Sequence, residues 1–280
     1  MKKILKPTLK VSEVFADCID TYSNQDLKHA LIDAIPILEE AEFDFEQKKQ
    51  KNELFLIPQN IAVSDIVNST TLKNVYTNKM VKKDNPKGRA HYDTIFLSAP
   101  KGICPLCSQR TVGTLDHYLP KALYPLLSVT PINLIPSCID CNKGKLVDFP
   151  QKSQDETLHP YYDDVEGFSW LKMTVVEIKP FVVKFYTNPP GNIQTLLAKR
   201  IKTHFDNFEL NKLYVVHAAQ EFENKKIYFE RLYKRGGSVV LEEHLTDEFE
   251  SRSSVNKNSW QAAFYEGLLG CAEFCNGEFF

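Results

Sequence analysis

Four cysteines and an Asp-His doublet are the side chains of this 280-residue sequence best suited to metal binding and catalysis. The cysteines form two CxxC pairs, Cys104 with Cys107 in CPLC and Cys138 with Cys141 in CIDC. Two-residue spacing lets both thiolates of a pair reach one tetrahedral ion, and two pairs complete the four-ligand shell of structural zinc. The sequence therefore predicts a closed four-cysteine zinc site, which holds the chain together and performs no chemistry itself.

Asp116 and His117 lie between the two pairs, in the segment LDHYLPK. Imidazole titrates near neutral pH, so His117 can take a proton from a water molecule as a general base. Asp116 alternates to the other side of a strand or turn, where its carboxylate can hold a divalent cation. This combination suits phosphodiester hydrolysis, which needs a nucleophilic water and a stabilised leaving alkoxide. The alternative for Asp116 is a turn residue, which is what a lone Asp would usually be. The alternative for His117 is a zinc ligand, but the four cysteines already complete the zinc shell.

The segment 104–145 resembles the HNH nucleases, which have the ββα-metal fold. LDHYLPK, NLIPSCIDCN and KGK match the order and spacing of that family's motif. The motif has a DH doublet followed by Pro, an NL dipeptide before the second cysteine pair, and a Lys shortly after the pair. The resemblance implies a metal-dependent endonuclease that cleaves DNA, and it leaves most of the chain outside the motif.

The resemblance also implies roles for individual residues. Asn142 would be the second ligand of the catalytic cation, where many relatives have His, and this departure favours an all-oxygen site for Mg²⁺ or Mn²⁺. Asn133 would hydrogen-bond the backbone near His117 and orient the imidazole. Lys145 would contact the scissile or adjacent phosphate; for Lys143, both a phosphate contact and a solvated side chain remain open.

His159, in LHPYYDD, has two open interpretations. It is a third ligand of the catalytic cation or a phosphate contact, or it is a packed histidine before a proline. A nitrogen ligand would shift the metal preference toward Mn²⁺ or Ni²⁺.

Charge and hydropathy constrain the partners. The net charge is −2, unlike the basic charge of most nucleic-acid binders, so a larger partner is expected to supply part of the grip on DNA. The basic residues between Lys79 and Arg89 form either a local binding face or a solvated loop. No apolar run is long enough for a signal peptide or a membrane span, which predicts a cytoplasmic protein.

The chain also resembles the stand-alone HNH effectors of Septu-type and retron-linked anti-phage systems, in the stretches YDTIFLSAPKGICPLC, GTLDH and HPYYDD. That resemblance implies an antiviral role beside an ATPase partner. Two alternatives remain open. One is an RNA- or tRNA-directed nuclease, because no residue distinguishes DNA from RNA. The other is a zinc-stabilised nucleic-acid-binding adaptor that does not cleave, although such a module is expected to have lost Asp116 or His117.

The sequence pattern and the resemblance together predict an α+β fold. A small ββα core with a four-cysteine zinc cage is expected inside mainly helical flanks that include a short antiparallel sheet. Three regions are expected: a helical one over 1–95, the HNH domain over 96–165, and a strand hairpin with helices over 166–280. Ser23 is predicted to cap a helix that Pro36 splits. Gly236 and Gly237 should break a long helix. Cys271 and Cys275 are expected on the buried side of one final helix.

Overall fold

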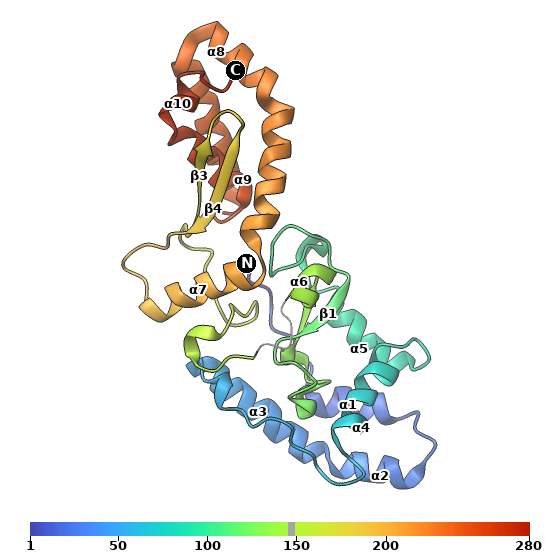
Figure 1. Ribbon diagram of the computed structural model, residues 1–280. Coiled ribbons are helices and arrows are strands. Elements are labelled where there is room, and N and C mark those ends of the chain that lie inside the picture. The colour runs from blue at the N-terminus through green and yellow to red at the C-terminus, as the bar shows by residue number, and fades with distance from the viewer. Residues whose placement is uncertain (145–148) are drawn as a thin grey trace. The chain divides into compact units, whose positions relative to one another are not determined.

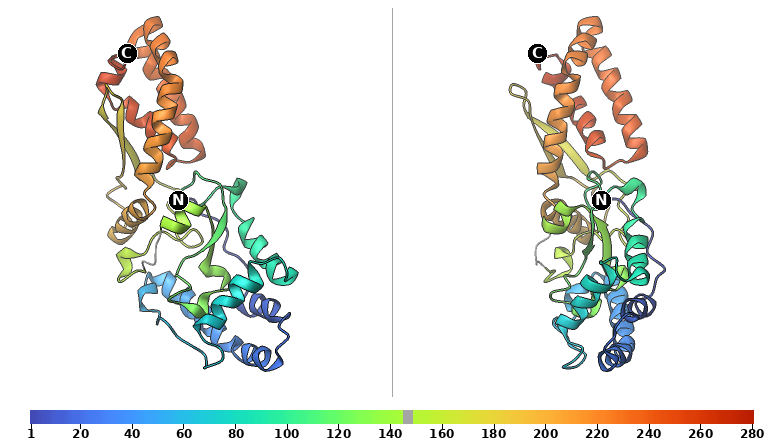
Figure 2. Two further views of the ribbon diagram at one scale, coloured as in Figure 1. Left: turned by 45° about the vertical axis from the view of Figure 1, so that its right-hand side comes forward. Right: turned by 90° about the vertical axis from the view of Figure 1, so that its right-hand side faces the viewer.

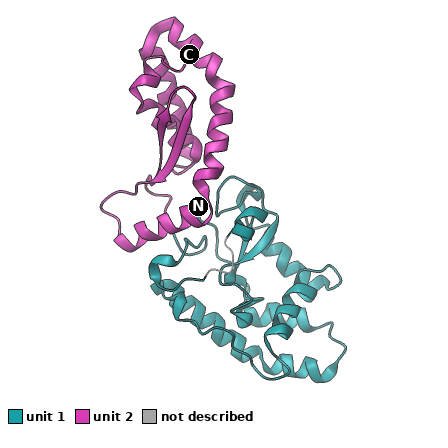
Figure 3. Cartoon of the chain, in the orientation of Figure 1, with its two compact units in different colours: residues 1–163 teal, residues 164–280 magenta. Residues whose placement is uncertain are grey.

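The computed structural model describes residues 1–144 and 149–280 (Figure 1). The described chain is α+β, as predicted, with two sheets of two antiparallel strands each. It forms two compact units, Met1–Asp163 and Asp164–Phe280 (Figure 3). The helices of region 1–95 and the segment with the two cysteine pairs belong to the same unit. Within the described residues, no helix combines the length and the apolar content needed to cross a bilayer.

The first unit places five helices before a short hairpin and a sixth helix after it. Its elements are α1 (Val11–Ile19), α2 (Gln25–Asp33), α3 (Ile35–Lys51), η1 (Leu54–Leu56), α4 (Ser69–Val75), the π-helical turn η2 (Tyr76–Met80), α5 (Pro86–Phe96), η3 (Pro100–Gly102), β1 (Thr114–His117), η4 (Pro125–Leu127), η5 (Pro131–Asn133), β2 (Leu134–Ser137), α6 (Ile139–Gly144) and η6 (Ser153–Asp155).

Helix starts in this unit depend on asparagine caps. The side chain of Asn24, not of Ser23, accepts a hydrogen bond from Leu27 N at 3.0 Å, so α2 begins one residue later than the sequence pattern indicates. Asn85 caps α5 in the same way and also donates to the carbonyls of the α1 C-terminus. Pro36 lies in the first turn of α3 and separates it from α2, as expected. Proline is tolerated in the first turn because the N–H groups there have no partner within the helix.

One hydrophobic core joins the helices to the hairpin. It contains Val14 and Phe15 of α1, together with Leu115 of β1 and Leu134 of β2, all at most 3% exposed. Cys18 belongs to the same core, and burial raises the pKa of its thiol to about 12, as expected for a packed cysteine. Two four-residue strands are marginal on their own, so this packing is part of what keeps the hairpin folded.

A buried ion pair fixes the last segment of the unit against α3. Lys49 Nζ lies 3.3 Å from Glu156 Oε2 and 3.5 Å from Asp163 Oδ2, and the side chains of Lys49 and Glu156 are fully buried. The other carboxylate oxygen of Glu156 accepts a hydrogen bond from Leu54 N at 2.8 Å. The same ammonium lies 6.0 Å from the ring centre of Tyr118, the residue that follows β1.

The second unit packs a hairpin against helices. Its elements are β3 (Leu171–Glu177), β4 (Val182–Thr187), α7 (Thr195–Asn207), α8 (Leu210–Val255), α9 (Trp260–Leu269) and α10 (Ala272–Cys275). β3 packs on α9 and β4 on α8 (Figure 2). Gly267 permits the first contact, since a Cβ there would lie 2.6 Å from the carbonyl oxygen of Met173.

The predicted helix break at Gly236 and Gly237 is present inside α8. Both residues have non-helical backbone angles, and Gly237 has a φ of +66°, which favours glycine. The two halves of α8 therefore pack against each other. Lys225 pairs with Glu248 at 3.2 Å, and the ring centres of Tyr228 and His244 lie 5.0 Å apart.

The single final helix expected from the sequence is wrong. α9 ends at Leu269 and α10 begins at Ala272, because Cys271 between them has an extended backbone. As a result Cys275 is buried, as expected, while Cys271 is only half-buried.

Replacement of Lys49 by Met should lower the free energy of unfolding by about 3–5 kcal/mol, because it leaves buried carboxylates without their cation. Urea unfolding followed by circular dichroism measures this. The matched control is Lys48→Met, which breaks a partly exposed pair with Asp44 and should cost at most about 1 kcal/mol. Equal losses in the two variants would show that the buried pair contributes no more than a surface pair.

Candidate metal centre and hydrolytic site

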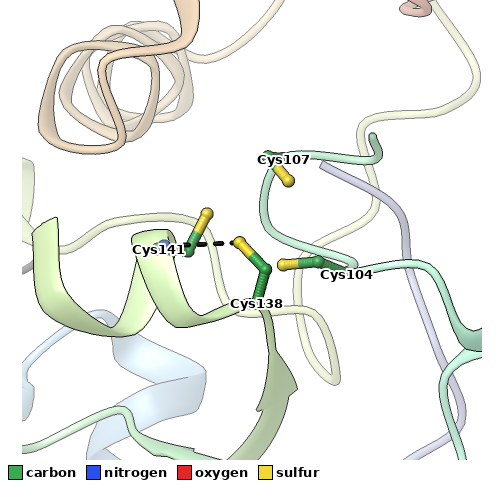
Figure 4. Close-up of side chains that lie close together, drawn as sticks. All are labelled: Cys104, Cys107, Cys138 and Cys141. Carbon is green, nitrogen blue, oxygen red and sulfur yellow. Dashed lines mark hydrogen bonds between the residues drawn. The ribbon is translucent and has the colours of Figure 1, made fainter. Parts of the chain in front are cut away.

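The four cysteines of the two CxxC pairs converge on one point (Figure 4). All four sulfur atoms lie within 4.8 Å of one another, and all four residues are buried. A tetrahedral zinc ion with Zn–S bonds of about 2.3 Å needs sulfur atoms separated by roughly 3.8 Å. The cluster is a candidate metal site whose donor set and spacing fit zinc. Within the described residues, no other group of three or more Cys, His, Asp or Glu side chains converges in this way.

Backbone amides point at the sulfur atoms of both pairs. Arg110 N donates to Cys107 Sγ at 3.4 Å, and Cys141 N donates to Cys138 Sγ at 3.3 Å. Contacts among the four thiols lower the pKa of Cys107 and Cys138 and raise the pKa of Cys104 and Cys141. The thiolate is the form that binds metal, and the two amide donors stabilise it at Cys107 and Cys138.

An ion pair outside the cage links the two cysteine pairs. Arg110 Nε, three residues after Cys107, lies 2.9 Å from Asp140 Oδ2, which stands between the cysteines of the second pair. The sequence pattern assigns Asp140 no role. The guanidinium adds a positive charge beside a cluster whose ligating form is negative, which favours that form.

The hairpin and α6 extend directly from the cage. β1 begins seven residues after Cys107, and β2 runs into Cys138; the strands pair antiparallel with Asp116 opposite Ile135 and His117 opposite Leu134. α6 begins inside the second cysteine pair and packs against β1. The cage therefore closes the open end of a strand–strand–helix arrangement, and the residues of the candidate hydrolytic site lie on its strands, loop and helix.

His117 has a defined orientation. Its Nε2 lies 2.8 Å from the carbonyl oxygen of Ser128, in the loop between the strands, and the residue is 9% exposed. A carbonyl oxygen can only accept a hydrogen bond, so Nε2 carries the proton. In the neutral ring, Nδ1 is then the nitrogen with the lone pair, and it can act as a base.

Asn133 holds together the loop that positions His117. Its Oδ1 accepts from Leu119 N at 2.7 Å, while its Nδ2 donates to the carbonyls of Leu119 and Leu127, each at 3.1 Å. Leu127 precedes Ser128, whose carbonyl accepts from His117. The fully buried Asn133 side chain thus connects the end of β1 to the turn whose carbonyl accepts the hydrogen bond from His117.

The ring of Tyr76 packs on His117 from outside the motif. The two ring centres are 4.4 Å apart at an interplanar angle of 71°. Burial, then the neighbouring Tyr92 and the Asp116 carboxylate, raise the pKa of Tyr76. The tyrosine is therefore a neutral wall of the site at physiological pH. Nothing in the sequence between the cysteine pairs indicates this contact, because Tyr76 comes from the helical region before them.

The remaining predicted site residues differ in their surroundings. Asp116 is 5% exposed on β1, and Asn142 is half-buried on α6. Lys143 is exposed at the end of α6, and Lys145 lies outside the described residues.

His159 is fully buried among the aromatic rings of Phe45, Tyr118, Tyr161 and Tyr162, with ring centres 4.3–6.1 Å away. Its Nδ1 accepts a hydrogen bond from Tyr161 N at 3.3 Å. These contacts favour the packed histidine over the metal ligand, the two interpretations that the sequence left open.

The chain is similar to Protein ea31 of Escherichia phage lambda. The two are 26% identical over 298 aligned positions, which span 99% of this chain and 100% of the phage protein. The similarity thus extends over both units. No family model matches the chain, and no solved structure matches it.

Replacement of Cys138 by Ser should reduce the metal content of the purified protein from about one zinc ion per chain toward zero, because a hydroxyl is a poor zinc ligand. Atomic absorption measures the content. Cys275→Ser is the matched control, since that buried cysteine lies in the second unit and should leave zinc unchanged. Full zinc content in Cys138→Ser would exclude the cage as the metal site.

Asn133→Ala should lower the free energy of unfolding by about 2–4 kcal/mol, because it leaves buried backbone groups without partners. Chemical denaturation measures the loss. Asn142→Ala removes the same side chain from a half-buried position and should cost under about 1 kcal/mol. If Asn133→Ala were as stable as Asn142→Ala, its hydrogen bonds would not hold the loop.

Proposed function

We propose that this chain is a metal-dependent HNH endonuclease that hydrolyses phosphodiester bonds of DNA. The observation that carries the proposal is the hydrogen bond from His117 Nε2 to Ser128 O, which makes Nδ1 the basic nitrogen. It stands on a hairpin whose ends meet at a four-sulfur cluster and which continues into a helix. This arrangement is the one that the resemblance to the HNH family leads us to expect.

In the proposed reaction, His117 Nδ1 accepts a proton from the attacking water. The imidazolium that forms keeps its Nε2–H on the Ser128 carbonyl, so the ring does not reorient during the proton transfer. Asn133 holds that turn in place, which makes it a positioning residue. The water oxygen bonds to phosphorus as the P–O3′ bond breaks, and the leaving 3′ oxygen takes a proton from solvent, which gives a 5′-phosphate and a 3′-hydroxyl.

Asp116 and Asn142 are the proposed ligands of the catalytic cation. They supply oxygen atoms from β1 and α6, two elements that pack together. Mg²⁺ typically binds through one or two carboxylates, retained waters and substrate phosphates, so a sparse protein shell of oxygen donors fits Mg²⁺ or Mn²⁺. When bound, such a cation stabilises the charge on the leaving oxygen. His159 is left out of this shell because of its aromatic surroundings. The four cysteines would hold a structural zinc ion that takes no part in the reaction.

A narrower form of the proposal concerns biological context. The resemblance to Septu-type and retron-linked effectors suggests the nuclease component of an antiviral complex in the cytoplasm, with an ATPase partner. The net charge of −2 supports a partner that contributes to DNA binding. The similar lambda protein is encoded by a phage, so the nuclease chemistry is proposed independently of a defence role.

A nicking assay on supercoiled plasmid tests the chemistry. Wild-type protein should nick the plasmid with Mg²⁺ or Mn²⁺ and not with EDTA, and His117→Ala should be slower by about 10²–10⁴-fold, the usual contribution of a general base. His29→Ala removes an exposed histidine of α2 and should cleave at the wild-type rate. Zinc content should be equal in all three proteins.

Unchanged cleavage by His117→Ala would overturn the assigned base. A zinc-loaded wild-type protein that cleaves neither plasmid nor single-stranded DNA, but does cleave RNA, would replace DNA with RNA as the substrate. Absence of cleavage on all three substrates, with the proposed partner present, would favour the non-cleaving adaptor.

A further inference from the structure

Tyr76 contacts both His117 and a lysine. The Nζ of Lys121 lies 4.3 Å from the centre of the Tyr76 ring, whose centre is 4.4 Å from that of His117. A cation at this distance from an aromatic ring is attracted by the electrons of its face. Lys121 Nζ also lies 3.4 Å from Thr77 Oγ1, the next residue of the same turn. The Tyr76 ring thus contacts both the Lys121 ammonium and His117, the proposed general base.

The backbone that carries Tyr76 is unusual. Residues Tyr76–Met80 form a π-helical turn, in which Val81 N donates to Tyr76 O at 3.0 Å. Single π turns are rare and occur often at functional sites, because the extra residue redirects the side chains around it. Here the turn follows α4 directly and presents Tyr76 toward the hairpin and Thr77 toward Lys121.

Neither Lys121 nor Lys73 of α4 forms an ion pair with a carboxylate among the residues that the structure describes. Thr77 Oγ1, which accepts a hydrogen bond from Lys121, also donates one to the Lys73 carbonyl oxygen at 3.0 Å, so the Thr77 hydroxyl links Lys121 to the backbone of Lys73. Burial, and then the charge of Lys73, lower the pKa of Lys121. Two like charges held near each other repel, and an anion that contacts both would relieve that repulsion.

We propose that Lys121 and Lys73 bind a backbone phosphate of the nucleic acid next to the scissile one, with Tyr76 as the ring that holds Lys121 in place beside His117. This inference rests on the proposed function, since it takes the substrate to be a nucleic acid. A lysine at a phosphate positions the strand and reads no sequence. The contact would fix the distance between the bound strand and His117 Nδ1.

Binding measured without cleavage tests the contact. In a His117→Ala background, the fluorescence anisotropy of a labelled DNA duplex is followed between about 50 and 200 mM salt. The slope of log affinity against log salt is negative, and loss of one phosphate contact in Lys121→Met should make it shallower by about 0.9. Lys121→Arg keeps the charge and should keep the slope, and Lys73→Met should act like Lys121→Met.

Lys51→Met is the matched control, because Lys51 is an exposed lysine at the end of α3. The same reduction in Lys51→Met would show diffuse attraction and overturn the proposed contact, as would an unchanged slope in Lys121→Met or no detectable binding at the lowest salt. A second readout applies to the cleaving protein: Lys121→Met should raise KM several-fold with kcat nearly unchanged. Lysine-dependent binding without any cleavage would retain this contact and overturn the nuclease proposal, so the two failures are distinguishable.

Discussion

The convergence of four cysteine sulfur atoms is the constraint on which the first unit depends. They lie on the chain before β1 and after β2, so a metal ion bound by them would close the open end of a hairpin whose strands have four residues each. Such short strands need outside support. The core around Leu115 and Leu134 supplies it along the face that packs on the helices, and a metal ion held by the four cysteines would supply it at the open end.

The loop between the strands has its own internal support. Asn133 forms hydrogen bonds with three backbone groups, and the carbonyl of Ser128 accepts a hydrogen bond from His117. A buried polar network is stable only when its members are satisfied, and these four hydrogen bonds all have a backbone partner. Asn133 holds the loop, and the Ser128 carbonyl in that loop sets the tautomer of His117. Structural and chemical requirements meet in one set of contacts.

The helices before the cysteine pairs contribute to the candidate site as well as to the core. Tyr76 reaches His117 from the turn after α4, and the ammonium of Lys121 lies over the same ring. Lys49 of α3 fixes the segment around Glu156, next to the aromatic cluster that encloses His159. The surroundings of the motif thus decide which of its histidines faces a polar loop and which is packed among rings.

The sequence alone was sufficient for features that depend on local spacing. Two CxxC pairs predict one cluster of four sulfur atoms, and a Gly-Gly pair weakens a helix by about 1 kcal/mol per residue. Contacts between distant segments were decided by the tertiary structure. The partner of His117 is a backbone carbonyl, at Ser128, which has no side-chain signature in a sequence. Tyr76 belongs to a helical region that gives no hint of the hairpin it covers. The aromatic surroundings of His159 include Phe45 of α3 and Tyr118 after β1, because packing brings together residues that no sequence spacing relates.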